Sequence, residues 1–213
     1  MTANAIETQG TKLEIGTGTG AAVTTVTAAV GFPTIITKNT HGLGNGDVVA
    51  LTAFAGTGAG DMNGKTVVIS NVTTNTLSVP INTIGKTLTA ANGTLTPVEF
   101  TEIGEITDFD GPSGSVTVID KTNLASTSRE KMLGLIDEGQ FSFSLNFYAA
   151  DTGQAAALAA RENKTLCNFR ITFSDDTTMT FTGYVTSFPK SGGTDGKVEG
   201  SITIEITGEV TQA

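Results

Sequence analysis

Residues 168–181, NFRITFSDDTTMTF, alternate apolar and polar side chains on both sides of a turn. The apolar positions are Phe169, Ile171, Phe173, Met179 and Phe181. A period of two predicts two antiparallel strands that each bury one face, and Ser174–Thr177 has the composition of a turn. The same pattern returns in SITIEITGEV, residues 201–210, where isoleucine alternates with threonine or glutamate. That strand is expected to have an apolar side and an acidic side.

Upstream of this region, residues 141–147 give the clearest strand, because Phe141, Phe143 and Leu145 alternate with small polar residues. A helix is predicted next over Gln154–Glu162, which is rich in alanine. Asp151 is its expected N-cap, with Gln154 three residues further on. One short helix is therefore expected among many strands.

Composition supports an ordered β protein, with 38% hydrophobic residues, 26 glycines and abundant threonine, valine and isoleucine. The net charge is −9, from 12 basic and 21 acidic residues. Such a chain is repelled by free nucleic acid, so a DNA-reading role is disfavoured. No apolar run approaches the roughly 20 residues that cross a bilayer, and Met1–Gly10 does not look like a signal peptide. We therefore expect a soluble protein that does not act at a membrane.

The charge is unevenly distributed along the chain. Residues 21–97 hold three lysines and two aspartates, a net charge of +1, whereas the remainder holds nine basic and nineteen acidic residues, a net charge of −10. Two compositions suggest two domains, one formed by 1–20 with 98–213 and one by 21–97. The inner stretch has five strand signals of its own, at Val23–Thr27, Thr34–Thr37, Val48–Thr52, Thr66–Ser70 and Thr76–Val79. It is expected to be a small all-β inserted domain, and the alternative is a long, decorated hairpin of the main domain.

Outside the insert, Thr11–Ile15 and Val98–Phe109 are predicted as strands, and the glycine-rich Gly16–Gly20 as a flexible linker. The stretch 111–139 has one short strand signal, at Val116–Ile119. A segment of that length without regular structure is uncommon inside a compact domain and is usually functional or disordered.

The order of these elements resembles a known family. The segments that support this resemblance are Thr8–Thr11, Ile103–Thr107, the phenylalanine-alternating strand, the helix, Phe169–Phe173, Gly183–Phe188 and Ile202–Val210. Together they resemble the major tail tube proteins of long, non-contractile-tailed (siphovirus-type) bacteriophages, over Glu7–Gly20 and Val98–Val210. The resemblance implies two packed antiparallel sheets, as a sandwich or half-barrel, flanked by one short α-helix. It also implies a virion protein, made in the host cytoplasm, that forms stacked hexameric rings around a channel for DNA ejection.

The resemblance further implies partners and an assembly element. The protein would bind copies of itself and the tape-measure, tail terminator and distal tail proteins, with no cofactor, no metal and no enzymatic activity. The segment 111–139 would be the ring-stacking loop, and the insert would lie on the outer surface. The candidate residues of this loop are Asp120, Lys121, Arg129, Glu130, Lys131, Met132, Leu133, Leu135, Ile136, Asp137 and Glu138. The alternative is a mobile surface loop.

An acidic channel would suit DNA passage, because like charge within a Debye length of about 8 to 10 Å leaves only repulsion of phosphates. The candidate lining residues are Glu102, Glu105, Glu205 and Glu209. The alternative for each of them is a solvated outer face.

An enzyme and a carbohydrate-binding module are the two rival function classes. An enzyme is disfavoured because His41 lies in a glycine-rich turn, Cys167 is expected in the core, and no cluster of these residue types could bind zinc. A carbohydrate-binding module, as in an adhesin or receptor-binding protein, is the alternative function. The absence of tryptophan disfavours it, and Phe32 and Phe54 of the insert are expected in its core.

Overall fold

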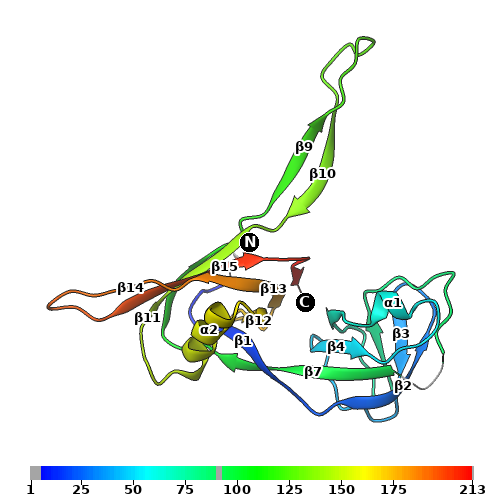
Figure 1. Ribbon diagram of the computed structural model, residues 1–213, viewed down its shortest axis with the longest axis horizontal. Coiled ribbons are helices and arrows are strands. Elements are labelled where there is room, and N and C mark those ends of the chain that lie inside the picture. Colours follow the sequence, from blue (N-terminus) through cyan, green and yellow to red (C-terminus); the bar gives the residue numbers. More distant parts are fainter. Residues whose placement is uncertain (1–5, 90–92, 213) are drawn as a thin grey trace, which may run out of the picture. The chain divides into compact units, whose positions relative to one another are not determined.

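The structure, a computed structural model, describes residues 6–89 and 93–212. These residues form two compact units, called here the frame unit (6–15 and 101–212) and the second unit (16–89 and 93–100). Strands β1 (Lys12–Thr19) and β7 (Gly93–Glu102) carry the chain from one unit to the other (Figure 1). The mainly-β class is confirmed, with a large antiparallel sheet, a small two-stranded sheet and two helices, one of them short.

The frame unit contains most of the large sheet, in the order β1-β12-β13-β15-β11-β8. Its further strands are β8 (Ile106–Asp110), β9 (Ser115–Asp120), β10 (Lys131–Asp137), β11 (Gln140–Asn146), β12 (Leu166–Thr172), β13 (Thr178–Ser187), β14 (Lys190–Ser191), β15 (Glu199–Ile206) and β16 (Thr211–Gln212). The strands predicted from alternation at 141–147, 168–181 and 201–210 are all present.

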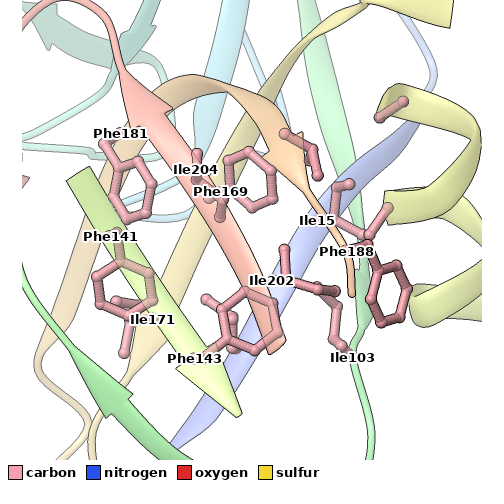
Figure 2. Close-up of a cluster of buried hydrophobic side chains, with 14 of the residues drawn as sticks. Ile15, Ile103, Phe141, Phe143, Phe169, Ile171, Phe181, Phe188, Ile202 and Ile204 are labelled. Carbon is pink, nitrogen blue, oxygen red and sulfur yellow. The ribbon is translucent and has the colours of Figure 1, made fainter. Parts of the chain in front are cut away.

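The alternating apolar residues form the core of the frame unit (Figure 2). The Phe181 ring centroid lies 5.5 Å from that of Phe141 and 5.6 Å from that of Phe169. A short distance shows that the sheet curls strongly. The ring centroid of Phe109, in β8, lies 6.4 Å from that of Phe173, which follows β12. In a flat sheet these strands, four positions apart, would be separated by about 19 Å. The curl encloses the core, so one face of the sheet is apolar and the other polar.

The stretch Val98–Phe109, predicted as one strand, is interrupted. Strand β7 ends at Glu102 and β8 begins at Ile106, because Glu105 adopts a left-handed φ of 62° that a strand does not accommodate. Ile103, between the two, is buried in the core. The turn carries the chain from β7, beside β1, to β8 at the far edge of the sheet.

Helix α2 (Thr152–Asn163) begins as predicted, since the Asp151 carboxylate accepts a 2.7 Å hydrogen bond from the Gln154 N–H. The Gln154 side chain is buried and hydrogen-bonds three backbone groups on two segments of the chain. It accepts from the Tyr148 N–H at 3.0 Å and donates to the carbonyls of Gly104 and Asn146, both at 3.1 Å. One side chain therefore fixes the helix to the ends of β8 and β11.

The second unit contains β2 (Val23–Ala29), β3 (Thr34–Thr37), β4 (Val48–Thr52), β5 (Thr66–Val68) and β6 (Thr76–Val79), close to the five predicted strands. A one-turn helix, α1 (Ala59–Met62), was not predicted. Strands β6-β3-β2 pair in that order, β4 pairs with β5 and β7, and β2 also pairs with β7. The unit has its own apolar core, centred on Ile36, Leu51 and Leu95.

Two expectations about this region are wrong. Gly16–Thr19 is not a linker but the second half of β1, and the Gly20 N–H donates to the Pro97 carbonyl at 2.8 Å. This part of the strand, GTGT, has no apolar side chain that would signal it in the sequence. Phe54 is buried as expected, whereas Phe32 is 63% exposed.

Candidate functional site

The segment 111–139 contains a two-stranded β-ribbon. The strand signal at Val116–Ile119 is present as β9, whereas the expectation that the rest of the segment is irregular is wrong, because β10 pairs with it. Among residues 6–89 and 93–212, strands β9 and β10 pair with each other alone and form the small second sheet. The ribbon leaves the frame unit between β8 and β11 and projects away from its core (Figure 1). Gly111 at its base has φ 113°, and a Cβ there would lie 2.6 Å from the Gln140 carbonyl oxygen, so this position requires glycine.

A β-bulge gives the ribbon one strongly apolar face. Leu133 lies opposite Val118, and Ile136 lies opposite Val116. In a regular strand, residues 133 and 136 would point to opposite sides, but the register shift between them brings both to the same side. We call Val116, Val118, Leu133 and Ile136 the apolar ribbon face.

The apolar ribbon face is open to solvent, with its four side chains between 37% and 69% exposed. The opposite face carries one apolar pair, Ile119 and Met132, beside Thr117. Leu135, in the bulge, is 89% exposed. Large apolar side chains gathered on one exposed face indicate an interaction surface rather than scattered surface residues.

Charged residues are sorted along the ribbon. At its far end Asp120 lies opposite Lys131, and Lys121 Nζ is 3.8 Å from a Glu130 carboxylate oxygen. The hydroxyl and the N–H of Thr122 hydrogen-bond Asp120 and hold its pKa below the ordinary value. With Arg129, residues 120–131 hold three basic and two acidic groups, a net charge of +1. The base is acidic, with Asp137 and Glu138.

A second surface is the polar side of the curled sheet. Strand register places Asp110, Ser142 and Thr203 in one row, and Asp108, Ser144 and Ser201 in the next. Glu205 lies beside them, opposite Gln140 on one neighbouring strand and Tyr184 on the other. We call Asp108, Asp110, Ser142, Ser144, Ser201, Thr203 and Glu205 the polar sheet face.

The structure distributes the four lining candidates over different places. Glu205 is on the polar sheet face, where it accepts a 2.8 Å hydrogen bond from Gln140. Glu105 accepts from Asn146 at 3.1 Å, at the other end of β11. Glu102 forms a 3.4 Å ion pair with Lys12, and Glu209 is exposed in the turn after β15. Glu205, Glu105 and Glu102 therefore each contact a different strand or strand end. The four candidates do not form one cluster.

Asp108 and Asp110 were missed as candidates. They are exposed and flank Phe109, whose side chain packs against the core. The alternation around Phe109 was a signal in the sequence that could have placed both carboxylates on the polar side.

Other candidate chemistry is absent from the described part of the chain. No group of three or more His, Cys, Asp or Glu side chains there could hold a metal ion. His41 is buried and its Nδ1 accepts from the Leu43 N–H at 3.2 Å, as suits a turn residue. Burial raises the pKa of the Cys167 thiol, which lowers its reactivity. Among residues 6–89 and 93–212, no helix has the length and apolar character needed to span a membrane.

Comparison with known proteins identifies the family. A family model described as "Lambda phage tail tube protein, TTP" matches residues 82–213, which is more than half of the chain. No curated protein was found to match the chain. The matched residues include β7 and every later element, and so both the ribbon and the polar sheet face. The chain therefore belongs to the lambda phage tail tube protein family, whose members are non-enzymatic structural proteins that self-assemble into the tail tube of the virion.

Proposed function

We propose that copies of this protein form hexameric rings and that the ribbon of each copy holds one ring against the next. The observation that carries this proposal is the apolar ribbon face. An isolated two-stranded ribbon has little stability in water, and its apolar side chains stay exposed unless another molecule covers them. A neighbouring ring would supply that cover.

Charge supports a copy of the same protein as the neighbour. The end of the ribbon carries +1, whereas residues 1–20 and 98–213 together carry −10. Opposite charges guide the ribbon toward the acidic frame of another copy and orient it there. Exposed ion pairs contribute under about 1 kcal/mol each, so the apolar ribbon face would supply most of the contact energy.

Side-to-side contacts within a ring would use an open sheet edge. In the described residues β8 pairs with β11 on one side only. An unpaired edge presents N–H and C=O groups that a strand from a second copy can satisfy. A head-to-tail contact of this kind closes into a ring, and stacked rings give a tube.

The polar sheet face is the proposed lining of the channel. Asp108, Asp110 and Glu205 would give it a negative potential that repels DNA phosphates during ejection. Glu102, Glu105 and Glu209 contribute to the same potential only if their own positions also face the channel. We propose that the second unit, whose residues 21–97 are predicted as an insert, lies on the outer wall, where its size would not obstruct DNA.

The remaining partners are proposed from the resemblance to the family. The tube is proposed to enclose the tape-measure protein and to contact the terminator and distal tail proteins at its ends, after assembly in the host cytoplasm. Neither a cofactor nor a membrane is part of the proposed function.

Electron microscopy of concentrated protein tests the assembly. Hollow filaments with sixfold rings are expected, and protein that stays monodisperse at every concentration would contradict the proposal. The lining is tested with Asp108→Lys and Asp110→Lys together, which should make tubes bind duplex DNA in a salt-dependent way. Asp175→Lys with Asp176→Lys, in the exposed turn after β12, is the matched control and should not produce this binding.

A further inference from the structure

A groove lies at the base of the ribbon, where the end of β10 meets the turn that follows β15. It has a volume of about 510 Å³ and is lined by residues 136–138 and 206–210. The Ile206 N–H donates to the Gly139 carbonyl at 2.9 Å, which ties the end of β15 to the base of the ribbon. We call this hollow the base groove.

The base groove combines apolar and acidic side chains. Ile206 is buried and Val210 packs against the core of the frame unit, whereas Asp137 and Glu209 are exposed. Among residues 6–89 and 93–212, the carboxylates of Asp137, Glu138 and Glu209 form no ion pair. A partner that brings an apolar side chain together with a basic one would therefore fit this groove, because like charges would be repelled from it.

The far end of the ribbon, residues 121–130, has this complementary character. Leu124 is fully exposed at the turn. The turn itself is ordered, because the Asn123 side chain accepts from the Ala125 N–H at 2.9 Å and the Asn123 carbonyl accepts from the Ser126 N–H at 3.0 Å. Arg129 is exposed and, in the part of the chain that the structure describes, has no acidic partner in an ion pair. An apolar side chain on an ordered turn loses less entropy when it binds.

We propose that the far end of the ribbon of one copy docks in the base groove of the next copy along the tube. Leu124 would cover Ile136 and Val210, and Arg129 would face Glu209. The ribbon cannot fill the groove of its own chain, because the two lie at opposite ends of β9 and β10 (Figure 1).

Such a head-to-tail contact repeats along a stack, since each copy offers one ribbon end and one groove. Ile136 belongs both to the base groove and to the apolar ribbon face, so the two contacts would form one continuous surface. The inference rests on the proposed stacking of rings and names the surface that receives the ribbon.

Exchange of charges in the full chain tests the pairing. Arg129→Glu should raise the concentration of protein left unassembled by about tenfold, because repulsion replaces an attraction. Adding Glu209→Lys should return it to the original value, since the two charges have then changed places. The matched control, Arg129→Glu with Asp175→Lys, has the same net charge and should not be restored. Normal assembly of Arg129→Glu, no rescue by Glu209→Lys, or equal rescue by both changes would overturn the inference.

A disulfide locates the contact independently of charge. In a Cys167→Ala background, Leu124→Cys with Thr207→Cys places one thiol at the far end of the ribbon and one in the base groove. Mild oxidation of sedimented tubes should give a series of covalent multimers, because each copy can link to two others. Leu124→Cys with Asp175→Cys, in the exposed turn after β12, is the control and should not give the series.

The outcomes separate this contact from the tube itself. Covalent dimers alone would indicate that two ribbon ends meet each other and would overturn the inference. Tubes that yield no multimers would also overturn it, while the stacking of rings would stand. Protein that forms no tubes in microscopy would contradict both proposals.

Discussion

Removal of the apolar ribbon face should weaken tube growth about 100-fold. The change is Leu133→Asn with Ile136→Asn. Both side chains are about two-thirds exposed in the single chain, at 69% and 66%. Full burial of a leucine or isoleucine contributes about 1.5–3 kcal/mol, so covering these exposed fractions contributes about 1–2 kcal/mol each. Loss of about 3 kcal/mol for the pair corresponds to roughly 100-fold in the association constant.

The assay is the concentration of protein left unassembled after tubes are sedimented. For growth by addition of identical units, this concentration tracks the dissociation constant and should rise about 100-fold in the variant. The fold of the frame unit should not change, because the substituted side chains are exposed. Far-ultraviolet circular dichroism and the unfolding midpoint check this point.

The matched control removes the same number of apolar side chains from the other side of the ribbon, as Ile119→Asn with Met132→Asn. These residues lie directly opposite each other across the two strands. A much smaller rise is expected. Equal losses from both sides, or normal assembly of the first variant, would refute the assignment of the bulged face as the contact surface.

Three further predictions concern the fold. Gln154→Ala should lower the free energy of unfolding by about 3 kcal/mol, measured by urea denaturation, because three backbone groups lose their partner; a loss under about 1 kcal/mol would show that water replaces the amide. Cys167 should react with iodoacetamide at pH 8 more slowly than a free cysteine, since a raised pKa leaves less thiolate at that pH, and equal rates would contradict the burial. Deletion of 21–97 with a short linker should leave a folded frame that still forms tubes, because Gly20 and Pro97 are hydrogen-bonded neighbours; an unfolded product in circular dichroism would show that these residues belong to the frame core.

The sequence was most informative where packing and local chemistry agree. The alternation at Phe141, Phe143 and Leu145 predicted β11, because each of these side chains is buried on one face. The N-cap at Asp151 could be predicted because its signal is local. The second role of Gln154, its hydrogen bond to the distant Gly104 carbonyl, depends on the tertiary fold and has no local signature.

The ribbon shows where the periodicity argument fails. Strand β10, with the sequence KMLGLID, does not alternate, since the bulge places two apolar residues on one face at an odd spacing. A strand that is exposed on both sides also lacks the burial that normally imposes alternation. Phe32 was misassigned for a related reason, because an aromatic residue is usually in the core. The first error falls on the surface that is proposed to bind the next ring.

A ribbon with exposed apolar side chains and unpaired edges also carries a risk of aggregation in a protein made in many copies. Such edges can seed amyloid-like stacking, which requires flat strands of low charge. The bulge increases the local twist, and the Asp120–Lys131 and Lys121–Glu130 pairs place gatekeeper charges at the end of the strands. The same irregularity that gathers the apolar side chains is therefore also expected to limit precipitation of newly made chains before they are incorporated.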